Sequence, residues 1–148
     1  MSSEKNILVA GTFDILHESH VDLLRNAKNL GNRLIVMLST DEFNAEKGKK
    51  AFQDYETRKY VLEAIRYVDL VVPEQSWDDK SLYVDMFDVY IFVMGDDWKG
   101  KFDFLKEEFP NLKIMYLPRG KVSSSNIKKE IGKLYSNNDK GLSKEKDE

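Results

Sequence analysis

The chain has 148 residues, a formal net charge of −3 and no cysteine. This length predicts a single domain with a sizeable core, and the lack of cysteine excludes disulfides and thiolate metal sites. The near-neutral charge balance offers no basic field for nucleic acid, and no apolar run approaches the roughly 20 residues that span a membrane. We therefore expect a cytoplasmic domain with neither nucleic acid nor a membrane as its partner.

The first buried strand is expected at residues 7–10, where four apolar side chains follow one another. It leads through Gly11 and Thr12 into a helix that ends at Gly31 and has an apolar stripe of Val21, Leu24, Ala27 and Leu30. A strand that turns directly into a helix leaves the backbone N–H groups of the helix start without intrahelical partners. Such a helix start binds anions, phosphate above all.

Four further apolar runs predict buried strands, at residues 33–38, 70–72, 89–94 and 114–117. Helices are expected between and after them, at residues 54–65 with Asp54 as the N-cap, within 76–88, over 102–109 and after 123. The polar connection at residues 39–50 is either a solvated loop or a lysine-bearing segment that closes over phosphates.

This alternation of strands and helices predicts an α/β fold, a Rossmann-like doubly wound five-stranded parallel sheet with helices on both faces. The domain is expected to span residues 1–135. Residues 136–148 contain one apolar side chain, Leu142, and predict a disordered polar tail. The polar motifs follow strands or begin helices, so they are expected at one edge of the sheet, where open α/β sheets bind ligands.

The only two histidines, His17 and His20, are three residues apart in the first turn of the first helix. They have three interpretations: chance surface residues, a metal-binding pair, or donors to a phosphoryl transition state. A metal pair lacks a credible third ligand, because the chain has neither cysteine nor another histidine. Placement behind a Gly-Thr turn at a helix start favours the third interpretation.

Residues 11–20 read G-T-F-D-I-L-H-E-S-H, which resembles the signature of the HxGH nucleotidylyltransferase superfamily and, within it, the cytidylyltransferases of the glycerol-3-phosphate type. Three later segments match elements of the same family in the same order: R-Y-V-D at 66–69, M-G-D-D-W at 94–98, and P-R followed by S-S-S within 118–125. Two departures stand out. Ser19 replaces the family glycine, and the loop after Arg119 is one residue shorter, with serines in place of threonines.

The resemblance implies that the phosphate of a small phosphorylated alcohol, glycerol 3-phosphate foremost, attacks the α-phosphorus of CTP and expels pyrophosphate. The CDP-activated product would serve cell-surface polymer or lipid synthesis. Mg²⁺ is expected to arrive with the triphosphate rather than on protein ligands. The resemblance also implies a homodimer with contacts through residues 66–69, and the aromatic side chains of Tyr60 and Tyr67 suit an interface.

Roles for individual residues follow from the same resemblance. Catalytic roles are implied for His17, His20, Lys47 and Arg119. Nucleotide contacts are implied for Thr12, Phe13, Asp14, Lys49, Arg66, Asp97, Trp98, Ser123, Ser124 and Ser125. Ser19 is counted with the nucleotide-binding residues, because its hydroxyl could bond to phosphate or crowd the ribose. The acceptor phosphate is assigned to Lys47, with the isolated Lys80 as a further candidate.

Several of these residues have a structural alternative. Asp14 could cap or fix a turn, Arg66 and Asp69 could form a buried salt bridge, and the three serines could act as ordinary N-caps. At the level of function, the S-S-S segment also resembles the I-S-S-T element of adenylyltransferases. Ser19 and the shortened loop would also suit a nucleotide-binding module without turnover.

Overall fold

The computed structural model describes residues 4–118 and 123–142. Its centre is a five-stranded sheet of β1 (Asn6–Gly11), β2 (Arg33–Ser39), β3 (Leu70–Glu74), β4 (Val89–Gly95) and β5 (Lys113–Leu117). All neighbouring strands pair in parallel in the order β3-β2-β1-β4-β5. The predicted α/β fold with a five-stranded parallel sheet is confirmed.

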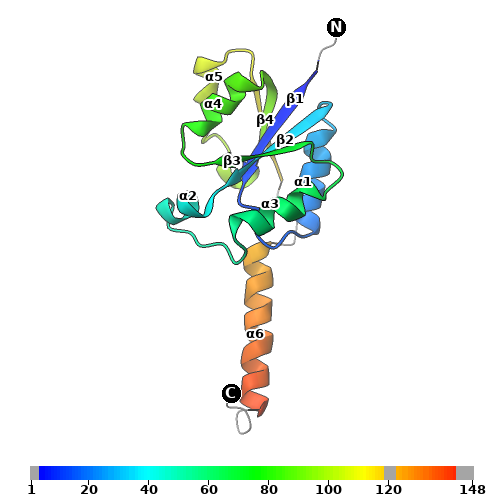
Figure 1. The fold of residues 1–148 in the computed structure, drawn as a ribbon, viewed down its shortest axis with the longest axis vertical. Helices are drawn as coiled ribbons and strands as arrows, with labels where there is room; N and C mark the ends of the chain where they lie inside the picture. Colours follow the sequence, from blue (N-terminus) through cyan, green and yellow to red (C-terminus); the bar gives the residue numbers. More distant parts are fainter. Residues whose placement is uncertain (1–3, 119–122, 143–148) are drawn as a thin grey trace.

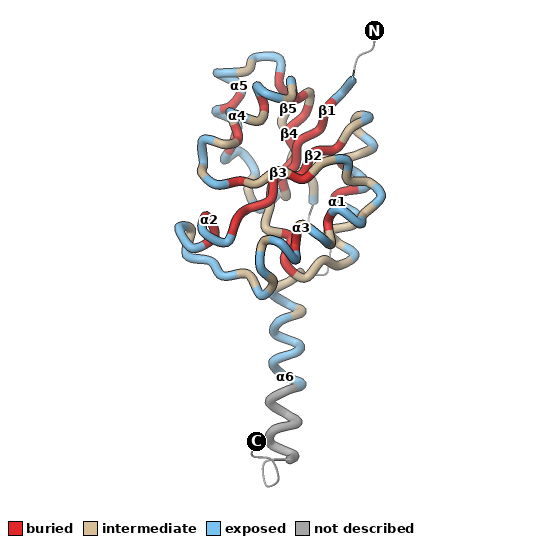
Figure 2. The backbone as a smooth tube through the Cα atoms, viewed as in Figure 1, coloured by how far each residue is buried: buried red, intermediate tan, exposed pale blue. Residues whose placement is uncertain are grey.

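Helices cover both faces of this sheet (Figure 1). On one face, α1 (Glu18–Lys28) and α3 (Tyr55–Glu63) supply Leu24 and Leu62 to a core that contains Ile7 and Val9 of β1. On the other face, α4 (Asp79–Met86) and α5 (Leu105–Glu108) pack against the alternate strand residues. Because central parallel strands are buried on both faces, their sequences are continuous apolar runs. Figure 2 shows these strands as the buried centre of the molecule.

The connection after β2 differs from the predicted polar loop, because it contains the helix α2 (Asp41–Glu46). Thr40 caps this helix by accepting a hydrogen bond from the Phe43 N–H at 3.1 Å, and Asp41 and Glu42 occupy its first turn. Acidic residues at a helix start are favourable there. Phe43 is fully buried and fixes the helix to the domain. By contrast, α5 spans only four residues of the predicted helix at 102–109.

The last helix, α6 (Ser124–Leu142), runs away from the domain (Figure 1). It continues through residues 136–142, the first part of the segment for which the sequence predicts a disordered tail, and 143–148 lie outside the described residues. Once a helix has begun, each further turn adds hydrogen bonds without a new nucleation cost, and this segment contains no proline. None of the helices in the described part is long and apolar enough to cross a membrane.

Candidate active site

A pocket of about 280 Å³ opens at the carboxyl ends of the strands. Its walls include Gly11 at the end of β1, Glu74 at the end of β3, Gly95 at the end of β4 and Leu117 at the end of β5. Most of the residues singled out in the sequence line it: Thr12, Phe13, Asp14, His17, Ser19, His20, Lys47, Lys49, Lys80, Trp98, Ser124 and Ser125. Arg119 lies outside the described residues.

The two histidines form the N-terminal cap of α1. His17 Nδ1 accepts a hydrogen bond from the Ser19 N–H at 3.2 Å, and His20 Nδ1 accepts one from the His17 N–H at 3.3 Å. The two rings stack with their centroids 3.8 Å apart. A ring nitrogen that accepts an N–H bond carries no proton, so each neutral imidazole has its proton on Nε2. The cap thereby sets both side chains as Nε2–H donors.

The loop between β1 and α1 is strained. Phe13 and Ile15 have φ angles of 50° and 51°, in the left-handed region that non-glycine residues rarely adopt. Gly11 makes room for the turn, because a Cβ there would lie 2.9 Å from the Phe13 ring. A strained loop persists only where its surroundings hold it, and two buried charged residues do so here.

Asp14 is the first of these residues. Its carboxylate accepts hydrogen bonds from the N–H groups of Phe52 and Gln53 at 2.7 and 3.0 Å. It also forms an ion pair with the Lys128 ammonium of α6 at 2.8 Å. Burial alone would raise the pKa of Asp14, but the Lys128 ammonium and the two N–H groups together hold that pKa below its ordinary value of 3.8. These contacts favour the turn-fixing role among the two interpretations of Asp14.

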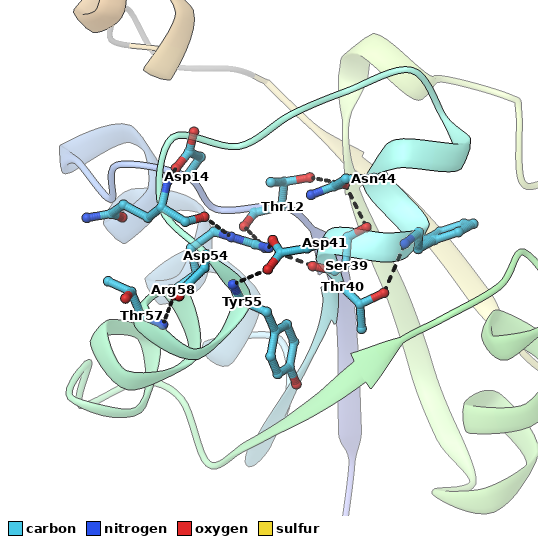
Figure 3. Close-up of polar contacts among 12 residues, drawn as sticks. Thr12, Asp14, Ser39, Thr40, Asp41, Asn44, Asp54, Tyr55, Thr57 and Arg58 are labelled. Carbon is cyan, nitrogen blue, oxygen red and sulfur yellow. Dashed lines mark hydrogen bonds and ion pairs between the residues drawn. The ribbon is translucent and has the colours of Figure 1, made fainter.

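Arg58 of α3 is the second. Its guanidinium is fully buried and donates to the carbonyl oxygens of Gln53, Thr12 and Ser39 at 2.8–3.0 Å, and to the Asp41 carboxylate at 2.7 Å (Figure 3). It therefore joins the ends of β1 and β2 to the start of α2. The available signal in the sequence was an arginine on the apolar face of the helix, in phase with Leu62 and Ile65.

Three lysines also line the pocket. Lys47, which directly follows α2, is half-buried and lies over the Phe43 ring, with Nζ 4.4 Å from the ring centroid. Burial lowers the pKa of Lys47. The Glu74 carboxylate opposes this shift, while the positive charges of Lys49, Lys80 and Arg58 add to it. Lys80 in the first turn of α4 is itself buried, and its ammonium forms an ion pair with Glu74.

A family model described as cytidylyltransferase-like matches residues 8–130. The chain belongs to this family. The glycerol-3-phosphate cytidylyltransferase of Bacillus subtilis is 50% identical to it over 131 residues, which are 88% of this chain and 99% of that protein. The enzyme of the same name from Staphylococcus aureus is 52% identical over 128 residues, 86% of this chain and 95% of that protein.

A solved structure of a lipopolysaccharide core biosynthesis protein from Thermoplasma volcanium shares the fold, with a TM-score of 0.70 and 24% identity over 82% of this chain and all of that one. Membership in the cytidylyltransferase-like family makes the chain a nucleotidyltransferase. The pocket suits such chemistry, because N–H donors, lysines and two helix starts surround a space in which phosphates would lie.

Of the predicted site residues that the structure describes, three do not line the pocket of this cytidylyltransferase-like chain: Arg66, Asp97 and Ser123. Arg66 is exposed and bonds to the Tyr67 hydroxyl, whereas Asp69 pairs with Lys28 and accepts from the Leu34 N–H. The alternative of a buried Arg66–Asp69 bridge is therefore wrong.

The three serines at the start of α6 differ in whether they cap the helix or line the pocket. Ser123 caps the helix by accepting from the Asn126 N–H at 3.0 Å, and Ser124 donates to the Asp14 carbonyl oxygen. Ser124 and Ser125 also line the pocket, so capping and pocket lining occur on adjacent residues. Ser19 lines the pocket too, at the second position of α1.

Sequence reasoning missed several pocket residues: Glu74, Trp77, Phe102, Leu117 and Pro118. Glu74 had a signal, since it is a carboxylate that ends an apolar strand at the edge where the other motifs gather. The apolar residues had none, because an aromatic side chain that lines a pocket reads in a sequence like one that fills the core. Within the described residues, no group of three His, Cys, Asp or Glu side chains could hold a metal ion.

Proposed function

We propose that this chain transfers a cytidylyl group from CTP to glycerol 3-phosphate, giving CDP-glycerol and pyrophosphate. The observation that carries the proposal is the 50–52% identity to two glycerol-3-phosphate cytidylyltransferases, of which the matches cover 99% and 95%. The product would supply cell-surface polymer or lipid synthesis, and the enzyme would act in the cytoplasm as a homodimer.

In the proposed reaction an oxygen of the acceptor phosphate bonds to the α-phosphorus of CTP. The bond from that phosphorus to the bridging oxygen breaks, and pyrophosphate leaves with the electron pair. Because the second pKa of a phosphate monoester is about 6, the attacking oxygen needs no general base near neutral pH. The protein has to position two anions and stabilise the charge that develops between them.

The described residues can meet both demands. The Nε2–H groups of His17 and His20 would donate to the triphosphate, and Lys49 and the starts of α1 and α6 would hold its oxygens. Lys47 and Lys80, which line the same pocket, would bind the acceptor phosphate. Mg²⁺ would enter with CTP and compensate the charge of the triphosphate.

Pyrophosphate release tests the proposal. Purified protein with Mg²⁺ is given CTP, ATP, GTP or UTP together with one of several phosphorylated alcohols. We expect the fastest release with CTP and glycerol 3-phosphate. A preference for ATP would instead indicate adenylyl transfer, and CTP binding without release would indicate a nucleotide-binding module.

A further inference from the structure

Glu74 is a buried carboxylate in the wall of the pocket. It is the last residue of β3, its exposed fraction is 2%, and its ion pair with the Lys80 ammonium is equally buried. Removing two charges from water is costly, and well-packed apolar residues often stabilise a fold as well as such a pair does. Stability alone therefore does not account for a buried ion pair at this place.

The surroundings of the pair point to a ligand. Lys80 Nζ lies 4.9 Å from the ring centroids of both Trp77 and Phe102, which also line the pocket. An ammonium has three N–H donors, and its bond to Glu74 fixes the direction of the others. Asp14, the other carboxylate among the described pocket residues, instead bonds to backbone N–H groups and to Lys128.

We propose that Glu74 is the positioning residue of the acceptor subsite, and that it orients the Lys80 ammonium toward the phosphate of the acceptor. The inference rests on the proposed function. In this assignment Glu74 touches neither the attacking oxygen nor the α-phosphorus, and it acts through the lysines. Without it, the Lys80 ammonium would lose its fixed orientation, and the acceptor phosphate would lose a directed, charge-assisted hydrogen bond.

Glu74 also acts on Lys47 through its charge. The groups whose charges bear on Lys47 are Glu74 from β3, Lys49 from the loop after α2, Lys80 from α4 and Arg58 from α3. Burial and the three cations lower the pKa of Lys47, and Glu74 alone among these charges raises it. Removing the negative charge of Glu74 lowers the pKa of Lys47 further, so Lys47 is deprotonated at a lower pH. The neutral amine then no longer attracts the acceptor phosphate.

The test compares the wild type, Glu74→Gln and the matched control Glu63→Gln, whose carboxylate is half-exposed on α3 and pairs with Lys59. KM for glycerol 3-phosphate, KM for CTP and the pH profile of kcat/KM for the acceptor are measured for each protein. We expect Glu74→Gln to raise KM for glycerol 3-phosphate by about tenfold or more, because it loses a charged hydrogen bond, with little change in KM for CTP. The alkaline limb of its pH profile should move to lower pH, and Glu63→Gln should match the wild type.

The outcomes separate the two proposals. A wild type that turns over no CTP and acceptor pair contradicts the proposed function itself. If the wild type is active, two results overturn the role of Glu74. One is an unchanged acceptor KM in Glu74→Gln. The other is an equal rise in both KM values together with an alkaline limb that does not move. If Glu74→Gln fails to fold by circular dichroism, Glu74→Asp decides. It keeps the charge but is shorter by one methylene, so the acceptor KM should rise while the alkaline limb stays, and an unchanged KM overturns the proposal.

Discussion

His17 and His20 serve the fold and the site with different nitrogen atoms. Their Nδ1 atoms cap α1, and this leaves the protons on Nε2. A substitution by alanine would therefore remove a helix cap together with a donor, and a loss of activity could follow from either change. Asparagine at the first position and glutamine at the second can keep the capping bonds without an imidazole.

His17→Asn and His20→Gln should each lower kcat by about 10²–10³-fold, the usual loss when one donor to a developing oxyanion is removed. Their melting temperatures should remain close to that of the wild type. His17→Ala should lose activity to a similar extent and also lose about 1 kcal/mol of stability with its cap. Pyrophosphate release at saturating CTP and thermal unfolding measure the two effects. Near-normal turnover of both capped variants would contradict the donor role.

At the scale of the elements, α3 is fixed to the site by the one residue of its inner face that is charged and buried, Arg58. Without the guanidinium, three backbone carbonyl oxygens would lose a donor, two of them at the ends of β1 and β2. Leaving a buried acceptor unsatisfied costs roughly 1–3 kcal/mol.

Arg58→Met should therefore lower the free energy of unfolding by about 3 kcal/mol or more, with water offsetting part of the cost. Lys59→Met is the matched control on the same helix. It removes only a partly exposed pair with Glu63, and such pairs contribute about 1 kcal/mol or less. Urea unfolding of the two variants measures the difference. Equal losses would show that the Arg58 contacts do not stabilise the fold.

Helix α6 is joined to the site through Asp14, whose pKa is held below 3.8 in the folded state. A carboxyl with a lowered pKa contributes stability that is fully present above its unfolded pKa and is lost as the pH falls through its folded pKa. Asp14→Asn should be less stable than the wild type near neutral pH. The gap should shrink as the pH falls below about 4.

Thermal unfolding across this pH range measures the effect for the wild type, Asp14→Asn and Lys133→Met. Lys133 is exposed on α6 and pairs with the exposed Glu130, so its loss should leave the melting temperature unchanged at both ends of the range. A gap between the wild type and Asp14→Asn that stays constant on acidification would contradict the linkage.

The sequence predicted the sheet better than the hydrogen bonds and ion pairs around the pocket, for a physical reason. A buried parallel strand is a local apolar run, so segments such as 33–38 and 89–94 can be recognised as strands from the sequence alone. The partners of Arg58 lie up to 46 residues away, and those of Asp14 up to 114 residues away, as Lys128 shows. No local pattern records such contacts. The helix after β2 was missed for another reason, because it has only six residues and Phe43 is its single large apolar side chain, too few for an apolar stripe.

At the scale of the whole molecule, apolar and aromatic side chains lie exposed on the surface of a single chain. Tyr60 of α3 is 78% exposed, and Ile131 and Leu134 of α6 are 56% and 64% exposed. Tyr67, in the segment that the resemblance assigns to dimer contacts, packs partly against the core and carries the Arg66 side chain over its ring. The Arg66 side chain thus lies on the surface, where a second copy of the chain could meet it.

We expect a homodimer whose contacts include residues 66–69 and Tyr60, with sedimentation at micromolar concentration as the measurement. A tyrosine at the centre of an interface typically contributes about 2 kcal/mol or more, so Tyr60→Glu should weaken the dimer by about 30-fold. Phe104→Glu is the control: Phe104 is 58% exposed next to α5, which packs on the opposite face of the sheet from α3, so this variant should associate like the wild type. If Arg66 of the partner chain completes the pocket, the activity per chain of Tyr60→Glu should fall on dilution and recover at high protein concentration. A wild type that sediments as a monomer with full activity would contradict both the dimer and a role for Arg66 across its interface.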